Sequence, residues 1–483
     1  MTKVINFPIV FRVVSHNLYL ISVAFIICML LASLLHEAVT PFLFSALITL
    51  LLGTLFYVIS KKRINDLTVQ RKDAYLTVSV SWIVISTVGS LPFLFSGEVP
   101  EVVDAVFESV SGFTTTGSSI LPDIESLPKS LLFWRSFTHW IGGIGIVVLV
   151  IVVMPAFRMG GYHLFTLESS LQEKILPKIK SVGIRLLLIY LVLTIAETLL
   201  LWAGEMDLFE SVCHAFGTVA TGGFSPKNSS IADYSVYSQY IILIFMVLAG
   251  TNFVIHYYLV KGQFSKIRKN EEFAFYLGVI LVLGFILSLI LIVKMHRGVE
   301  VAFREAFFQL VSIVTCTGYA TADYLEWPVY AWMIIFFGML LGGSTGSTAG
   351  GIKMVRHLVL FKNLSRIFKQ LLSPKAILPV RLNGKTLKEP ANRSIISFIV
   401  IYLMVLAVGS LILMALGLDV KTAGSASATC MAGIGPGLGT VGPASNFAHL
   451  PALAKSVLIV LMLFGRLEIY TLLILFTRNF WRQ

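Results

Sequence analysis

Ser111-Gly-Phe-Thr-Thr-Thr-Gly-Ser-Ser119 is the first of four related stretches along the chain. The second is Phe216-Gly-Thr-Val-Ala-Thr-Gly-Gly-Phe224, and the third is Ile313-Val-Thr-Cys-Thr-Gly-Tyr319. The fourth, Met431-Ala-Gly-Ile-Gly-Pro-Gly437, keeps the glycine and lacks the threonine. Four similar units indicate a pseudo-fourfold arrangement.

The residues that lead into three of these stretches also recur. They read Val106-Phe107-Glu108-Ser109-Val110, Leu208-Phe209-Glu210-Ser211-Val212 and Phe303-Arg304-Glu305-Ala306. About a dozen moderately apolar residues precede each stretch, which is too few to cross a bilayer. We therefore expect a short helix that enters the membrane and turns back, because non-helical backbone at membrane depth must be buried in protein or line water.

The composition indicates a polytopic membrane protein. Of 483 residues, 57% are hydrophobic and 13% are charged, and the mean hydropathy is +0.87. The 37 Lys and Arg residues exceed the 25 Asp and Glu residues, but they cluster between apolar spans. This pattern follows the positive-inside rule and does not indicate nucleic acid as a partner. The four cysteines have no metal-ligand spacing and indicate neither a disulfide framework nor a zinc site.

Ten stretches are long and apolar enough to predict spanning helices, and the first is expected to be retained, not cleaved. Basic connections after the even-numbered spans predict that those loops and both termini are cytoplasmic. The predicted spans are 18–35, 42–60, 74–95, 131–154, 182–202, 236–260, 273–293, 327–341 with a Gly-rich continuation, 395–416 and 452–476.

The predicted fold is an all-α polytopic membrane protein. It contains four pseudo-fourfold units, each a helix, a re-entrant pore helix and a helix, preceded by an N-terminal transmembrane hairpin. The predicted domains are the two-helix domain 1–70, pore unit 1 at 71–180, pore unit 2 at 181–270, pore unit 3 with an intramembrane gating loop at 271–390, and pore unit 4 at 391–483.

The connections on the opposite face carry acidic residues that flank the repeated stretches, among them Glu98, Asp123, Glu125 and Asp207. An acidic vestibule would raise the local concentration of cations. The alternative is that these loops simply carry the charge that solvated loops usually carry.

The repeated stretches have the chemistry of a cation filter. A pore that passes a monovalent cation must replace the hydration oxygens of the ion, and rings of backbone carbonyls do so. Glycine permits the backbone angles that aim carbonyls at an axis. We expect Gly117, Gly222, Gly318 and Gly435 at one level, whereas the alternative is a set of tight turns in extracellular loops.

The helix after each repeated stretch contains a cluster of small residues. In the first two units, 140–145 and 248–252, close helix packing explains the cluster as well as a functional break does. The third cluster cannot propagate a stable helix, continues an apolar span and is a candidate gate; it lacks the Gly-Lys-Ser/Thr of a phosphate-binding loop. Its residues are Gly342, Gly343, Ser344, Thr345, Gly346, Ser347, Thr348, Ala349, Gly350 and Gly351.

Arg466 lies inside an apolar span, where a central arginine costs about 2.5–3.5 kcal/mol. It needs a partner, and Glu468 at i+2 does not share its helix face. Backbone carbonyls of 342–351 are better candidates, and Arg466 would then form an electrostatic barrier beneath the filter. The alternative is a buried ion pair or a snorkelling side chain. Arg135, His139 and His256 are assigned packing or interfacial roles.

These residues together resemble the Trk/Ktr/HKT superfamily of potassium transporters, and specifically its TrkH branch. The resemblance covers the whole chain: the four units, the N-terminal hairpin, the segment 342–351 and Arg466. It implies a gating role for 342–351 with Arg466, and a selectivity filter that binds K⁺ as its substrate ion, without an organic cofactor. The implied filter residues are Thr115, Thr116, Gly117, Ala220, Thr221, Gly222, Cys316, Thr317, Gly318, Gly433, Ile434 and Gly435.

The same resemblance implies ion preference, partners and location. Sodium-preferring plant relatives carry serine in place of the first glycine, so Gly117 favours potassium, with rubidium as its mimic. Similar proteins are homodimers that dock a cytoplasmic ring of TrkA-like nucleotide-binding regulatory subunits in the bacterial cytoplasmic (inner) membrane. The basic segments suit such docking, but they equally suit the positive-inside rule or contact with anionic membrane lipid.

The leading functional hypothesis is gated potassium uptake. The alternative within transport is an obligate proton- or sodium-coupled potassium symporter, for which Glu197 and Glu468 are the obvious proton-carrying residues. An enzyme would need paired His, Asp or Glu at catalytic or metal-binding spacing, and the sequence contains no such set, so no enzymatic activity is expected. A scaffold without transport would not need four re-entrant loops.

Overall fold

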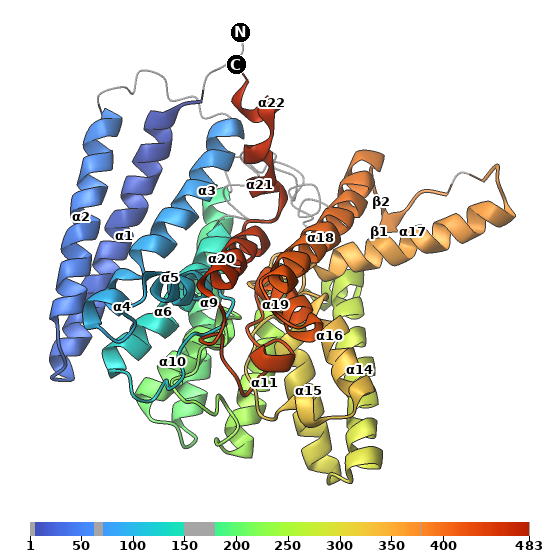
Figure 1. Cartoon of the computed structure of the whole chain (residues 1–483). Coiled ribbons are helices and arrows are strands. Elements are labelled where there is room, and N and C mark those ends of the chain that lie inside the picture. Colours follow the sequence, from blue (N-terminus) through green and yellow to red (C-terminus); the bar gives the residue numbers. More distant parts are fainter. Residues whose placement is uncertain (1–4, 62–70, 149–178, 377, 483) are drawn as a thin grey trace.

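The computed structural model describes residues 5–61, 71–148, 179–376 and 378–482. The described part is mostly helical, as predicted (Figure 1). The one sheet in it is the two-stranded antiparallel hairpin of β1 (Arg381–Leu382) and β2 (Lys385–Thr386). The helix α1 begins and α22 (Arg478–Trp481) ends at the same end of the molecule (Figure 1).

The N-terminal helices α1 (Phe7–Leu34) and α2 (Thr40–Lys61) form a packed hairpin. Small polar residues tie them together, because Ser15 Oγ donates to Gly53 O at 2.8 Å and Ser22 Oγ donates to Ala46 O at 3.1 Å. Glu37 in the connecting turn accepts bonds from the backbone N–H groups of Lys129 and Ser130 at 2.8 and 2.9 Å. This carboxylate therefore caps the start of the first helix after the first pore loop.

A long helix, a short helix and a further helix recur four times after the hairpin (Figure 1). The first set is α3 (Arg71–Val88) with α4 (Leu91–Ser96), then α5 (Val102–Phe113) and α6 (Lys129–Val148). The second is α9 (Ile179–Trp202), α10 (Leu208–Val219), and α11 (Val236–Ala249) with α12 (Phe253–Val260), followed by α13 (Phe264–Arg268). The third is α14 (Glu271–Met295), α15 (Val299–Val314), η2 (Tyr324–Glu326), α16 (Val329–Met339) and α17 (Met354–Leu372). The fourth is α18 (Glu389–Ala415), α19 (Val420–Ala432), η3 (Gly439–Val441), α20 (Ala452–Arg466), α21 (Tyr470–Leu473) and η4 (Ile474–Phe476).

Six helices in the described ranges are long and apolar enough to span a membrane, and two bent pairs raise that number to eight. Of the ten predicted spans, 327–341 forms only the 11-residue helix α16 before the Gly-rich segment interrupts it. The predicted span 131–154 begins as α6, and its residues from 149 onward lie outside the described part of the chain.

Two predicted straight spans are in fact sharply bent. The helix α11 meets α12 at 101°, where Asn252 begins the new helix by accepting a bond from Val254 N–H at 2.9 Å. The helix α20 meets the α21 and η4 segment at 108°, next to Glu468, whose φ is +52°. Both bends include small or polar residues, within 250–252 and 466–468, but each bent pair taken together is still apolar enough to pass as one span, which is why an apolar-run criterion counted each pair once.

The helix α17 projects from the helical body, whereas the β1 and β2 hairpin that follows lies against the body, with Leu382 buried and Asn383 Oδ1 accepting a bond from Glu271 N–H (Figure 1). Its base is held by Asn363, which exchanges two hydrogen bonds with Asn392 of α18 at 2.7 and 2.9 Å. Several apolar side chains on α17 are exposed, including Phe361, Phe368 and Leu371 at 57%, 65% and 72%. The domain limits predicted from the sequence remain predictions.

Candidate functional site

Each of the four short helices ends in the same backbone conformation. The residue one or two positions beyond the helix has a left-handed φ: +53° at Thr115, +55° at Thr221, +58° at Cys316 and +72° at Gly433. Only one of the four is glycine. Non-glycine residues rarely adopt this region, and doing so costs of order 1–2 kcal/mol. The surrounding structure therefore imposes this turn at all four positions.

A second left-handed residue follows two positions later in every loop. Gly117, Gly223, Gly318 and Gly435 have φ values of +81°, +79°, +83° and +105°. The residue between the two left-handed positions donates its N–H back to the carbonyl five residues earlier. These bonds run from Thr116 to Ser111, Gly222 to Gly217, Thr317 to Ser312 and Ile434 to Thr429 at 2.7–3.0 Å. The four loops thus share one local fold.

The loops contact one another in cyclic order. A Cβ atom added to Gly117 would lie 2.1 Å from Gly222 O, and one added to Gly223 would lie 1.9 Å from Thr317 O. One added to Gly318 would lie 1.8 Å from Ile434 O, and one added to Gly435 would lie 3.0 Å from Thr116 O. Each glycine therefore abuts a backbone carbonyl of the next loop, and the last glycine abuts the first loop.

The register of the second loop is one residue later than the sequence suggested. Gly223, not Gly222, has the conformation and the neighbour-loop contact of Gly117, so the equivalent triplet is Thr221, Gly222 and Gly223. Ala220 lies one position before that triplet, at the end of α10. Comparing the four repeated stretches did not single out Gly223, because either of two adjacent glycines could be the counterpart of Gly117. The backbone bond from Gly222 to Gly217 settles the register.

The lead-in residues of the first unit are also shifted, by one helical turn. Because α5 and α10 begin at Val102 and Leu208, the counterpart of Glu210 is Asp104. Glu108 instead occupies the position of His214 and Gln309. All three side chains bond to the segment after their loop: Glu108 to Ser119 Oγ, His214 to Ser225 Oγ and Gln309 to Ala322 O, at 2.7–3.1 Å.

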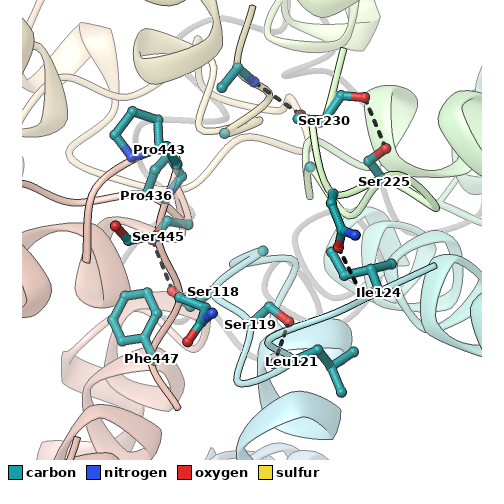
Figure 2. A pocket seen from close by; sticks show the side chains of 18 of the residues that line it. Ser118, Ser119, Leu121, Ile124, Ser225, Ser230, Pro436, Pro443, Ser445 and Phe447 are labelled. Carbon is teal, nitrogen blue, oxygen red and sulfur yellow. Dashed lines mark hydrogen bonds between the residues drawn. The ribbon is translucent and has the colours of Figure 1, made fainter. Parts of the chain in front are cut away.

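A cavity of about 190 Å³ opens on one side of the loops, and residues from all four loops line it (Figure 2). Its wall includes Gly117, Gly223, Gly318 and Gly435, together with Ser118, Ser225 and Ser445. No Asp or Glu lines this cavity within the described ranges, whereas Arg135 and Lys227 do. The nearby Glu125 lies 3.6 Å from Lys227 Nζ and accepts a bond from Asn228 N–H. The described wall of this cavity is therefore not acidic, and the acidic vestibule expected from the connecting loops stays a prediction.

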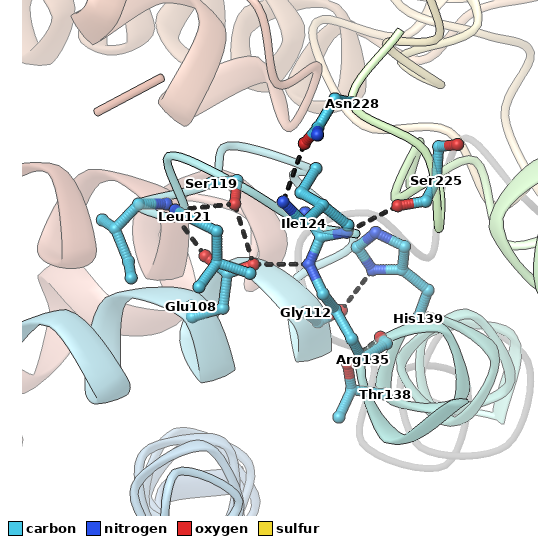
Figure 3. A network of polar contacts seen from close by, with 11 residues as sticks. Glu108, Gly112, Ser119, Leu121, Ile124, Arg135, Thr138, His139, Ser225 and Asn228 are labelled. Atoms are coloured by element: carbon cyan, nitrogen blue, oxygen red, sulfur yellow. Dashed lines mark hydrogen bonds and ion pairs between the residues drawn. The ribbon is translucent and has the colours of Figure 1, made fainter. Parts of the chain in front are cut away.

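A buried polar network supports the first two loops (Figure 3). Arg135 Nε lies 2.6 Å from Glu108 Oε1, and the other carboxylate oxygen accepts a bond from Ile120 N–H at 3.0 Å. Arg135 Nη1 donates to Ser225 O at 2.8 Å, and its guanidinium lies 3.7 Å from the centre of the Phe224 ring. Arg135 therefore links the first loop to the second, a larger role than the packing or interfacial one the sequence suggested.

His139 is buried next to the same loops (Figure 3). Its Nδ1 lies 2.7 Å from Gly112 O, and its ring stacks on Phe224 with a 4.1 Å separation between ring centres. A Cβ atom on Gly222 would lie 2.4 Å from His139 Cδ2. The histidine ring thus packs directly behind the second loop.

The Gly-rich segment 342–351 folds into a closed loop between α16 and α17. Leu341 and Ile352 form an isolated bridge, Gly342 N–H donates to Ile352 O at 3.0 Å, and Met354 N–H donates to Gly343 O at 3.1 Å. These bonds bring the two ends of the segment together. The interruption of the helix by small residues was correctly predicted from helix propensity.

The tip of this segment contacts other units beside the pore loops. Thr348 Oγ1 donates to Val219 O at the end of α10 at 3.0 Å. A Cβ atom on Gly350 would lie 2.1 Å from Ala432 O at the end of α19. The segment is therefore wedged against the ends of the second and fourth short helices.

Arg466 ties this tip to the first unit. Its Nη1 donates to Thr348 O at 3.1 Å, and its Nη2 donates to Gly142 O on α6 at 2.9 Å. The expected contact with a carbonyl of 342–351 is present. Glu468 instead pairs with Arg356 on α17, with 2.7 Å between Oε2 and Nη2.

Two of the other small-residue clusters pack closely against short helices. A Cβ atom on Gly142 would lie 2.0 Å from Phe113 O, and one on Gly465 would lie 1.9 Å from Met431 O. The helix α6 stays continuous through its cluster, so packing explains the first unit. In the second unit the chain both packs and breaks, because α11 ends at Ala249 and α12 begins at Phe253.

The fold and the loop contacts define a class: a multi-span α-helical membrane protein in which four short helices bring four loops into contact with one another. Comparison with known families identifies the member of that class. The TrkH family, described as cation transport protein, matches residues 41–295 and 277–483. The chain belongs to this family, which consists of transporters and not of enzymes.

Individual relatives match along their whole length. The Trk system potassium uptake protein TrkH of Escherichia coli (strain K12) is 36% identical over 99% of this chain and 100% of its own. The protein of the same description from Vibrio parahaemolyticus is also 36% identical, with the same coverage. The crystal structure of the potassium transporter TrkH from Vibrio parahaemolyticus superposes with a TM-score of 0.90 at 34% identity, covering 99% of this chain and 100% of that one.

Proposed function

We propose that this chain takes up potassium across the bacterial cytoplasmic membrane through a pathway formed by the four loops. The observation that carries the proposal is the cyclic contact of Gly117, Gly223, Gly318 and Gly435 with carbonyls of neighbouring loops. A ring of backbone oxygens at one level is what a dehydrated monovalent cation requires. The curated relatives named above are described as potassium uptake proteins, which supports K⁺ as the substrate ion.

The proposed filter consists of three successive residues from each loop. Their backbone carbonyls replace the hydration oxygens of K⁺, and the left-handed backbone at the first and third residues of each triplet sets the direction of those carbonyls. The fourth loop carries no threonine in its triplet, so its contribution is backbone oxygen alone. The residues are Thr115, Thr116, Gly117, Thr221, Gly222, Gly223, Cys316, Thr317, Gly318, Gly433, Ile434 and Gly435.

The proposed gate is the segment 342–351 together with Arg466. The bonds from Arg466 to Thr348 O and Gly142 O hold a cationic group between the first unit and the tip of the segment. A fixed positive charge on the ion pathway raises the barrier to a permeating cation. In this conformation the pathway is closed, and opening requires the tip to leave Val219 and Ala432.

Obligate ion coupling is the second candidate, and one observation favours it. Glu197 on α9 is completely buried, and neither of its carboxylate oxygens has a hydrogen-bond partner within the described ranges. Buried carboxyl groups within membrane spans are the residues that proton-coupled transporters use as proton carriers. Potassium flux that requires a proton or sodium gradient would support coupling over passive conduction.

The proposed assembly is a homodimer that binds a cytoplasmic ring of TrkA-like nucleotide-binding subunits, with both termini cytoplasmic. The exposed apolar stripe on α17, formed by Phe361, Leu364, Phe368 and Leu371, supports self-association, because these residues recur on one helix face. The basic connections of the predicted cytoplasmic face suit the regulatory subunits or anionic lipid.

The test is rubidium flux into liposomes that contain the purified protein, with sodium as competitor. Wild type should pass rubidium selectively, Gly318→Ser should lose discrimination against sodium, and Arg466→Ala should raise the flux. If Gly318→Ser discriminates between rubidium and sodium as well as wild type does, the proposed filter is contradicted. An unchanged flux in the arginine variant would contradict the gate.

A further inference from the structure

Glu272 is a buried acidic residue in the first turn of α14, and it contacts the Gly-rich segment from outside. Glu272 is only 1% exposed to solvent. Its Oε1 accepts two backbone bonds, from Thr345 N–H at 2.6 Å and from Val355 N–H at 3.1 Å. The first donor lies in the segment 342–351, and the second lies at the start of α17. One carboxylate oxygen thus binds both the segment and the start of the helix that follows it.

This arrangement is not ordinary helix capping. Acidic residues are common in a first turn because they complement the helix dipole. The start of α14 is already capped by Asn270, whose Oδ1 accepts the Phe273 N–H bond at 2.8 Å. Glu272 uses its carboxylate on another element, and its Oε2 has no partner among the described residues. Burying a carboxylate is costly, so its two charge-assisted bonds matter to the element that donates them.

The turn that carries Glu272 is itself firmly held. The neighbouring residue Glu271 forms an ion pair with Lys362 Nζ on α17, and its N–H donates to Asn383 Oδ1 at 2.9 Å. Glu272 is therefore a fixed anchor point beside a segment rich in glycine. Backbone bonds also hold the segment, since Ser344 N–H donates to Gly250 O at 2.9 Å and Phe253 N–H donates to Gly346 O at 3.1 Å. Two charged side chains bind it in addition, Glu272 at Thr345 and Arg466 at Thr348.

We propose that Glu272 is a latch that keeps the segment 342–351 in its closed position by binding the N–H groups of Thr345 and Val355. The inference rests on the proposed gate and adds a positioning residue to it. Releasing the latch loosens the segment at Thr345 and its link to the start of α17, and the tip then leaves the pathway more often. The filter loops are not touched, so ion preference stays the same.

The experiment measures rubidium flux into liposomes with the full-length protein and no regulatory subunit. Glu272→Gln exchanges charge-assisted bonds for weaker neutral ones, and we expect flux to rise about tenfold. Val355→Pro removes one of the two donors without changing any charge, at a first-turn helix position where proline is tolerated. It should raise flux as well. Sodium competition should match wild type in both variants.

Glu389→Gln is the matched control, because Glu389 is also an acidic first-turn residue but lies on α18, away from the segment. Its flux should equal that of wild type. If Glu272→Gln and Val355→Pro behave like wild type while Arg466→Ala raises flux, the latch is wrong and the gate stands. If Arg466→Ala also changes nothing, the gate itself fails and the latch fails with it. The latch would also be overturned if both latch variants lost their discrimination against sodium and their thermal stability as well. If Glu272→Gln does not fold, the flux of Val355→Pro alone decides whether the latch exists.

Discussion

Arg135 Nε and Glu108 Oε1 lie 2.6 Å apart, and the two side chains are 3% and 0% exposed. The pair joins α5 to α6 and, through Ser225 O, the first loop to the second. Removing one partner of a buried ion pair leaves an uncompensated charge and typically costs about 3–5 kcal/mol. The pair therefore supports the side of the proposed filter that these two loops form.

Arg135→Met should lower the thermal unfolding midpoint and the flux, because Glu108 is left buried without its cation. Glu108→Gln should also lower both, and its unpaired Arg135 at the wall of the cavity repels incoming cations. The double variant Glu108→Gln with Arg135→Met removes both charges and should recover part of the stability. Thermal unfolding in detergent and rubidium flux are the measurements.

The control is Arg393→Met, which breaks an exposed pair with Glu389 on α18; those side chains are 78% and 54% exposed. Exposed pairs of this kind contribute about 0.5 kcal/mol or less. An unfolding midpoint for Arg135→Met equal to that of Arg393→Met would show that the buried pair does not stabilise the loops.

Gly223 and Gly222 give a test of the register of the second loop. Gly223→Ala places a Cβ atom 1.9 Å from the backbone oxygen of Thr317, at a φ of +79°. The added methyl group clashes with backbone and strains the left-handed turn, and no second substitution that shortens a side chain can relieve either effect. The loop must therefore shift, and discrimination against sodium should be lost. Competition between rubidium and sodium measures this loss.

Gly222→Ala meets a different obstacle, the ring of His139 at 2.4 Å. Because that obstacle is a side chain, the second change His139→Ala should restore part of the discrimination in Gly222→Ala. The same change should not rescue Gly223→Ala. Rescue of both variants, or of Gly223→Ala alone, would contradict the register described here.

The sequence was sufficient to predict features that depend on local backbone chemistry or on the cost of charge. The loops were predicted because glycine recurs where left-handed backbone is needed, as at Gly117 and Gly318. The contact of Arg466 with a carbonyl of 342–351 was predicted because an unpaired arginine in an apolar span is too costly.

The features that were missed depend on contacts between distant elements. The register of Gly223 could not be chosen between two adjacent glycines without the neighbouring loop. The role of Arg135 depends on Glu108, which lies 27 residues away on another helix. The sequence left the cluster 248–252 open to either close packing or a break, and the 101° bend between α11 and α12 shows that the chain breaks there.

The apolar stripe of α17 predicts the oligomeric state. Phe368→Glu with Leu371→Glu places two charges on a stripe whose residues are 65% and 72% exposed. If a second copy covers this stripe, the particle mass in detergent should fall from dimer to monomer by light scattering. Lys385→Glu on the nearby hairpin is the control and should leave the mass unchanged. A dimeric mass for the double variant would mean that another surface joins the copies.

Gly350 offers a test of the gate that does not involve charge. Gly350→Ala places a Cβ atom 2.1 Å from the backbone oxygen of Ala432, so the tip of the segment must move away from α19. That displacement weakens the seat of the tip beneath the loops, and rubidium flux without regulatory subunits should rise by about tenfold. The control is Gly278→Ala on α14, where an added Cβ meets nothing within 4 Å and flux should stay at the wild-type level. If Gly350→Ala folds normally and its flux equals that of Gly278→Ala, the tip does not obstruct the pathway, and Arg466 alone would have to account for the barrier.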